Sequence, residues 1–333
     1  MLSAAHTELL MSRMEWEERW LELEAVGRVD LPGYPGSTLR GALGTVMRPA
    51  LCARGGECGE QCESPGTCPF FSLFEQSRAG GGSGGGQGPN IPKPLILESP
   101  LVEGLRAIAV GGAVAEPYEL SGAGAAIAAR ERVAVEPGSR VRVGLRALGA
   151  AAAALDGIVE GVRRSGGLEV KGGRLRLAGV EARRGGLTTT MAMPLVARRV
   201  RLALVTPTLI NGGAGGTCFD PVVLGRMIPD QALIRAVSLY NAFLRGPREE
   251  KIPFVEPRWP GAWMTAHRLF RYRLPRQSYR QGKWMDFDGV VGWMEWEGPG
   301  VGAMVPWLRA AEALHVGQKA TFGLGRVELL LLE

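Results

Sequence analysis

Histidine and long apolar runs are scarce in this sequence. Its 333 residues include three histidines, His6, His267 and His315, so few groups titrate near neutral pH. No Ser/His/Asp set or carboxylate pair can be argued from the spacing. No stretch of about 18 uncharged apolar residues occurs, which excludes an ordinary transmembrane helix. Residues 1–13 lack the charged start and apolar stretch of a signal peptide. We therefore expect a cytoplasmic protein with no membrane partner.

The five cysteines contain no C-x-x-C pair, so a redox pair is disfavoured. Four of them crowd together as C-x5-C-x3-C-x5-C, at Cys52, Cys58, Cys62 and Cys68. In a cytosolic protein such a cluster more often binds metal than forms disulfides. Standard zinc sites more often have C-x2-C spacing. A structural zinc, a partly occupied site and reduced cysteines packed under a loop therefore stay open, and Cys218 is expected to be structural.

A glycine-rich stretch follows the cysteines. Residues 80–88 read GGGSGGGQG, which is typical of a flexible loop without packing side chains. The segment before this stretch is too short to form a domain. We therefore predict a Cys-rich and Gly-rich insertion at about residues 50–95.

The hydrophobic pattern predicts an α+β fold. Residues 199–333 follow the order strand, helix, strand, strand, helix, strand, which is the ferredoxin-like unit shared with RNA-recognition modules. The first half follows the same plan, with Ser37 as the expected N-cap of a helix that Pro49 ends. Asp220 and Pro221 are expected to begin a helix in the second half. We predict two tandem ferredoxin-like (RRM-like) domains, with a tail at 1–13, the first domain at 14–195 and the second at 196–333.

Basic and aromatic residues alternate in the second half. The chain carries a net charge of +6, and residues 265–285 contain no acidic residue. Arginine neutralises phosphates and stacks on bases, and aromatic rings offer stacking platforms. The alternative is a solvated strand and loop whose aromatic residues belong to the core. We predict nucleic-acid contacts from Arg268, Arg271, Arg273, Arg276, Arg280 and Lys283.

A second glycine-rich segment lies near the C-terminus, at residues 317–326. Glycine lets a backbone approach a ligand closely and present amide donors to phosphate. No lysine-serine or lysine-threonine pair follows the last glycine, so this is not a P-loop. A tight turn before an edge strand is the alternative. The predicted RNA contacts here are Gly317, Lys319, Gly323, Gly325 and Arg326.

Several segments, taken in order, resemble the precursor CRISPR RNA endoribonucleases of the RAMP superfamily. The first is Leu31-Pro-Gly-Tyr-Pro-Gly-Ser-Thr-Leu-Arg-Gly-Ala-Leu-Gly, which resembles the entrance to the family's first helix. The cysteine segment with the following Pro-Phe-Phe-Ser-Leu-Phe-Glu is similar to one branch of the family. The others are Val205-Thr-Pro-Thr-Leu, Arg271-Tyr-Arg-Leu-Pro-Arg-Gln and His315-Val-Gly-Gln-Lys-Ala-Thr-Phe-Gly-Leu-Gly-Arg.

The resemblance implies two ferredoxin-like domains, CRISPR repeat RNA or crRNA as partner, and cleavage without a catalytic cofactor. The ribose 2′-hydroxyl would attack the adjacent phosphate and leave a 2′,3′-cyclic phosphate. Thr45 stands where related sequences often have histidine. Tyr34, Arg40, His267 or His315 would then take its role. The alternative is a non-catalytic RNA-binding subunit of a CRISPR effector complex, bound to other Cas subunits.

Overall fold

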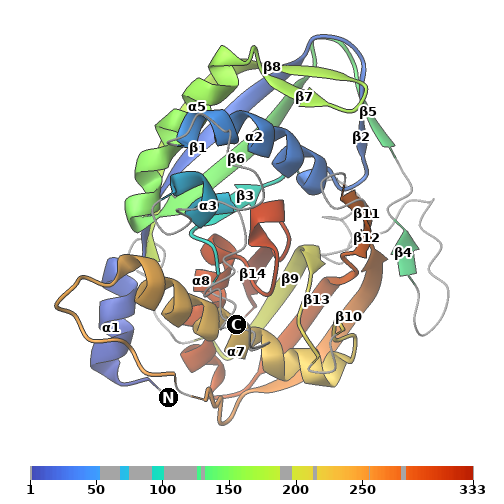
Figure 1. Ribbon diagram of the computed structural model, residues 1–333. Coiled ribbons are helices and arrows are strands. Elements are labelled where there is room, and N and C mark those ends of the chain that lie inside the picture. The colour runs from blue at the N-terminus through green and yellow to red at the C-terminus, as the bar shows by residue number, and fades with distance from the viewer. Residues whose placement is uncertain are drawn as a thin grey trace.

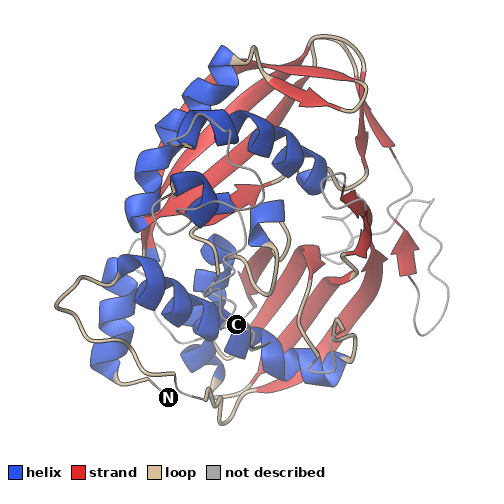
Figure 2. Ribbon diagram, in the orientation of Figure 1, coloured by secondary structure: helices blue, strands red, loops and turns tan. Residues whose placement is uncertain are grey.

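The computed structural model describes residues 2–52, 68–74, 92–100, 126–128, 132–187, 197–212, 216–254, 256–278 and 283–332. The chain forms two five-stranded sheets, and helices cover one face of each (Figures 1 and 2). None of the helices in the described ranges is long and apolar enough to cross a membrane.

The first sheet is antiparallel, in the order β3-β6-β1-β8-β7. Its strands are β1 (Glu15–Ala25), β3 (Leu95–Glu98), β6 (Arg140–Leu148), β7 (Leu168–Val170) and β8 (Gly173–Gly186). The helices over it are α2 (Gly36–Leu51) and α5 (Leu155–Arg164), with the 3-10 turn η1 (Gly149–Ala154) before α5. Alternate residues of β1 and β6, such as Leu21 and Val143, form the core with Leu39 and Ile158 of these helices.

The second sheet has the order β14-β9-β13-β10-β4. Its strands are β4 (Ala126–Ala128), β9 (Arg199–Thr208), β10 (Trp263–Arg273), β13 (Gly289–Glu297) and β14 (Val327–Leu331). Its helices are α7 (Pro221–Leu239), which runs into the π turn η2 (Tyr240–Leu244), α8 (Val301–Leu314) and the 3-10 turn η3 (Ala320–Phe322). Asp220 caps α7 as expected, because its carboxylate accepts from the amides of Val222 and Val223.

Both sheets have the strand order of a ferredoxin-like domain. Numbered within each βαββαβ unit, the first sheet reads 2-3-1-4 and the second reads 4-1-3-2, which is the same order seen from the other side. The prediction of two tandem ferredoxin-like domains is therefore confirmed. The chain also has smaller elements. They are α3 (Pro69–Phe74), β2 (Val29–Pro32) paired with β5 (Arg132–Val135), and β11 (Pro275–Ser278) paired with β12 (Lys283–Asp286).

Three local expectations differ from the structure. The segment expected as a tail contains α1 (Ala4–Arg13), whose Leu10 is buried in the core of the second domain. Ser37 is not the N-cap of α2, because Pro35 occupies that position and the helix begins at Gly36. Pro49 lies inside the last turn of α2 and does not end the helix, which continues to Leu51.

The two domains share buried apolar contacts. Trp16, Ile96 and Leu148 of the first domain join the core of the second. A separate cluster brings Tyr34 together with Phe322 and Leu324. The C-terminal glycine-rich segment therefore lies at the junction of the domains.

Candidate functional site

The glycine-rich segment is held against the end of β9. The amides of Gln318 and Gly325 donate to the carbonyls of Leu209 and Pro207, at 3.0 and 3.1 Å. Gly317 has a φ of 77°, and a Cβ there would lie 2.4 Å from the carbonyl oxygen of Leu209. No side chain fits such an approach, so the sequence needs glycine at this position.

These internal bonds limit which amides can reach a phosphate. The amides of Gln318, Phe322, Gly323 and Gly325 all donate to carbonyls of the protein. In this conformation, Gly323 and Gly325 therefore do not offer the amide donors that the sequence predicted. Lys319, a non-glycine residue with φ 66°, is half-buried, with its ammonium 5.7 Å from the centroid of the Phe287 ring.

Two predicted catalytic residues reach the segment from the first domain. The Tyr34 hydroxyl donates to the carbonyl of Phe322 at 2.9 Å, and the side chain is buried. Burial raises the pKa of Tyr34 well above its ordinary value, and Tyr272 and Glu98 act in the same direction. The Arg40 guanidinium lies between the rings of Phe74 and Phe322, 4.1 Å from each centroid. A cation thus lies beside the segment.

His315 ends α8 at the base of the segment. Its backbone has a φ of 59°, and its side chain is 1% exposed. Nδ1 lies 2.9 Å from the carbonyl oxygen of Leu324, and Nε2 lies 3.3 Å from Oε1 of Glu98 in the first domain. Both neighbours are acceptors, and a neutral imidazole has one N–H to give. Burial lowers the pKa of His315, although Glu98 partly offsets it.

Glu98 is the centre of a buried charge network. Its carboxylate contacts Nη1 of Arg146 at 2.9 Å and Nη1 of Arg326 at 3.4 Å. Burial opposes ionisation, but His315, Arg146 and Arg326 outweigh it and lower the pKa of Glu98 to about 2. Arg146 and Arg326 are the two guanidinium partners of this carboxylate. Arg146 also binds Glu18, with Nε 2.7 Å from Oε1.

Two arginines cap the C-terminus of α8. Nε of Arg235 donates to the carbonyl of Leu314 at 2.6 Å, and Arg146 donates to the carbonyl of Ala313. Positive charge is favourable at this end of a helix, where carbonyls lack partners. Burial lowers the pKa of Arg235 to about 10, so it stays charged at pH 7. These contacts set the position of His315 and of the segment that follows it.

Two family models cover nearly the whole chain. A model described as an N-terminal domain matches residues 14–198, and the model of the CRISPR-associated endoribonuclease Cas6 matches residues 202–327. The C-terminal part of the chain, residues 202–327, is therefore similar to the Cas6 endoribonuclease family. None of the curated proteins matches the sequence.

Solved Cas6 structures share the fold at low identity. A Cas6 product complex from Thermus thermophilus is 16% identical, with a TM-score of 0.54 over 96% of this chain and 100% of that one. A chain of a partial Cas6-RT-Cas1–Cas2 complex is 11% identical, with a TM-score of 0.51 over 95% of this chain and 46% of that one. At such identities the likeness concerns the fold alone.

The structure brings together three of the four predicted catalytic residues. Tyr34, Arg40 and His315 surround residues 322–324, whereas His267 is exposed on β10. The order β14-β9-β13-β10 places β9 and β13 between His267 and the strand that follows the segment. His267 is therefore apart from the other three.

The arginines of β10 are only partly available for RNA. Arg268 and Arg273 are exposed on β10, and Arg271 is paired with Asp288, with Nε 3.1 Å from Oδ2. Tyr272 is buried in the cluster around Phe322, so it belongs to the core. Arg280 and the side chains of Arg276 and Lys283 lie outside the described residues.

The cysteine cluster is described at its two ends. Cys52 and Cys68 are half-buried and form no disulfide within the described part of the chain, and Cys58 and Cys62 lie outside it. Among the described residues no group of three possible metal ligands occurs. The zinc site stays a prediction.

Sequence reasoning missed Glu98 and Arg146. Glu98 ends the buried strand Leu95–Glu98, and an acid at the end of such an apolar run is an available signal. Arg146 is one of several arginines on β6, and its pattern does not distinguish it from the exposed Arg140. Only the contact between the domains separates the two.

Proposed function

We propose that this chain binds CRISPR repeat RNA and processes precursor crRNA. The match of residues 202–327 to the Cas6 endoribonuclease model carries the proposal, since it extends from β9 through the glycine-rich segment. The position of that segment at the domain junction, beside Arg40, Lys319 and Arg326, supports the same interpretation. Cations gathered at one site suit a phosphate backbone.

The proposed reaction needs no metal. The 2′-hydroxyl oxygen bonds to the adjacent phosphorus, and the bond from phosphorus to the 5′-oxygen of the next nucleotide breaks. The 2′-hydroxyl proton leaves to a base, and a proton is supplied to the departing 5′-oxygen. The products are a 2′,3′-cyclic phosphate and a 5′-hydroxyl. Arg40 and Lys319 are the cations we assign to the charge that builds up on the phosphate oxygens.

Tyr34 and His315 support this reaction by holding the segment. Each bonds to a carbonyl of the segment, Phe322 and Leu324 respectively, and each is at most 2% exposed. The raised pKa of Tyr34 makes it a poor base at neutral pH. In this proposal, alignment of the RNA and charge stabilisation supply most of the rate enhancement.

A non-catalytic RNA-binding subunit is the second candidate. The burial of His315 favours it, because a proton-transfer group must come within hydrogen-bond reach of the RNA. Such a subunit would copurify with guide RNA and other Cas subunits and bind repeat RNA tightly without turnover.

The test is cleavage of the host's own repeat RNA in EDTA, with the product ends mapped by mass spectrometry. We expect a 2′,3′-cyclic phosphate. We also expect Arg40→Gln to slow single-turnover cleavage about a hundredfold, as for loss of a group that stabilises transition-state charge. Arg176→Gln is the matched control, since Arg176 is exposed and paired with Glu24 on another part of the first sheet. Tight binding with intact RNA would select the non-catalytic candidate, and no binding would overturn both.

A further inference from the structure

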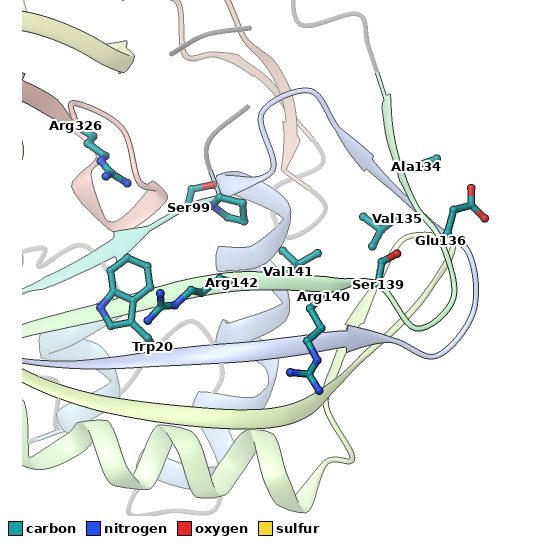
Figure 3. A pocket seen from close by; sticks show the side chains of 11 residues that line it. Trp20, Ser99, Ala134, Val135, Glu136, Ser139, Arg140, Val141, Arg142 and Arg326 are labelled. Atoms are coloured by element: carbon teal, nitrogen blue, oxygen red, sulfur yellow. The ribbon is translucent and has the colours of Figure 1, made fainter. Parts of the chain in front are cut away.

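A pocket of about 530 Å³ opens on the face of the first sheet that carries no helix. Its lining comes from β1, β5, β6 and the residues after β3, together with Arg326 of the second domain (Figure 3). Pockets that hold small organic groups span about 300–1,000 Å³. The volume is therefore enough for one nucleotide.

One end of the pocket combines an aromatic ring with cations. The Arg142 guanidinium lies over the Trp20 ring, 4.8 Å from its centroid. Figure 3 shows the two side chains next to each other. The Trp20 indole N–H donates to Oε2 of Glu18 at 2.8 Å, which fixes the ring. A guanidinium stacked on an indole presents its other face to a further flat group, such as a base.

The charge of the lining is positive. Arg140, Arg142 and Arg326 stand against a single acid, Glu136. The acidic partners of Arg140 and Arg142 are Glu22 and Glu181, and neither lines the pocket. The Arg142 side chain is 44% exposed, and exposed ion pairs of this kind are weak, so a phosphate can compete for it.

A buried hydroxyl in the lining has no partner among the described residues. Ser99 is 4% exposed, and its Oγ makes no hydrogen bond to that part of the chain. A buried polar group without a partner carries a desolvation cost, which a ligand hydroxyl or phosphate oxygen would remove. Ser99 also lies against the glycine-rich segment, since a Cβ placed on Gly323 would be 2.9 Å from the Cβ of Ser99.

We propose that this pocket binds one unpaired nucleotide of the RNA substrate. This inference rests on the proposed function. The base stacks on the Arg142–Trp20 pair, Arg326 contacts the phosphate and Ser99 bonds to an oxygen of the ribose or phosphate. Arg326 also binds Glu98, so the bound nucleotide and the glycine-rich segment share a contact.

The test uses three variants of the full chain with two RNA probes, the host's repeat RNA and a ten-nucleotide oligoadenylate, and with adenosine monophosphate as a third ligand. Arg142→Gln should weaken oligoadenylate binding about tenfold, as for loss of one stacked base. It should also flatten the salt dependence of log Kd by about one unit. The Arg176 side chain is 60% exposed and lies outside the lining, so Arg176→Gln should bind both probes as wild type does.

Ser99→Ala distinguishes a role of Ser99 in ligand binding from a role in stability. Removal of an unpartnered buried hydroxyl should leave the melting temperature of the free protein unchanged or higher. The same variant should bind oligoadenylate several-fold more weakly. A lower melting temperature with unchanged binding would contradict the assignment of Ser99.

The outcomes separate the pocket from the proposed function. If wild type binds repeat RNA and Arg142→Gln binds both RNA probes as tightly as wild type does, the pocket inference fails and the proposed function stands. An equal loss in Arg142→Gln and Arg176→Gln indicates diffuse charge and also overturns the pocket. If adenosine monophosphate binding falls while binding of both RNAs is unchanged, the pocket takes a free nucleotide and the inference is wrong. If Arg142→Gln and Ser99→Ala weaken oligoadenylate binding but wild type does not cleave repeat RNA, the pocket inference stands and the cleavage part of the proposed function is wrong.

Discussion

His315 and Glu98 meet across the boundary between the two domains, with Nε2 of the imidazole 3.3 Å from Oε1 of the carboxylate. Through Arg146 and Arg326, Glu98 also joins β6 of the first domain to the residue directly before β14 of the second. The position of the glycine-rich segment therefore depends on a side chain that belongs to the other domain.

Glu98→Gln should destabilise the protein in a pH-dependent way. It leaves Arg146 with one fewer acidic partner in a buried site, so we expect a loss of about 2–4 kcal/mol in the free energy of unfolding at pH 7. The folded pKa of about 2 lies below the ordinary value of 4.5. Ionised Glu98 therefore contributes stability above about pH 4.5, and that contribution is lost as the pH falls toward 2. Urea unfolding at pH 7 and pH 3 measures it.

The control for Glu98 is Glu22→Gln. Glu22 pairs with Arg140, and both side chains are exposed, so its loss should stay within about 0.5 kcal/mol at either pH. A Glu98→Gln variant as stable as wild type at pH 7 would rule out a stabilising role for the network.

His315→Ala should weaken RNA binding and cleavage together. Its Nδ1 faces the carbonyl of Leu324, so its removal loosens the segment that both activities need. His315→Gln keeps an amide donor and should retain more of both. Fluorescence anisotropy and single-turnover cleavage measure the two activities, with His6→Ala on α1 as the control. A loss of a hundredfold or more in cleavage with unchanged affinity would instead make His315 a general acid or base.

Lys319→Ala should weaken repeat-RNA binding and reduce the slope of log Kd against log salt by about one unit, as for one phosphate contact. Lys251→Ala is the matched control, because Lys251 is exposed in the loop after η2. Titrations at several salt concentrations decide the matter. Wild-type affinity and slope in Lys319→Ala would remove this residue from the RNA site.

The cysteine cluster should bind one zinc per chain and stabilise the insertion, since metal binding couples to the folding of such a loop. Elemental analysis of protein purified without chelator should find about one equivalent of zinc. Cys58→Ser should lower that content, and Cys218→Ser, at a buried position in the second domain, should not. Less than about a tenth of an equivalent in the wild type would leave the reduced-thiol alternative.

Much of the fold was predictable because local pattern and capping specify it. The second half has the predicted order of strand, helix, strand, strand, helix, strand, and the Asp220–Pro221 start of α7 has the expected hydrogen bonds. The wrong prediction of a tail at residues 1–13 has a long-range cause. Nothing near residues 1–13 in the sequence reveals that Leu10 is buried in the core of the second domain, because α1 lies against η2, in the other half of the chain.

The candidate site was predictable only in part. Its residue types and the glycine-rich segment are visible in the sequence, and the positive φ of Gly317, Gly323 and Gly325 accounts for glycine there. That the amides of Gln318 and Gly325 donate internally was not visible, because their acceptors, the carbonyls of Leu209 and Pro207, lie at the end of β9, more than a hundred residues earlier in the chain.

The sequence by itself determined the fold class, the two-domain plan and the resemblance to a family, because hydrophobic periodicity, caps and short motifs are properties of neighbouring residues. Tertiary structure alone decided that His315 is buried, that His267 is apart from it, and that Glu98 and Arg146 connect the domains. The physical reason is that pKa, exposure and ion pairing depend on which groups meet in space. For Glu98 and His315, those groups are 217 residues apart in the chain.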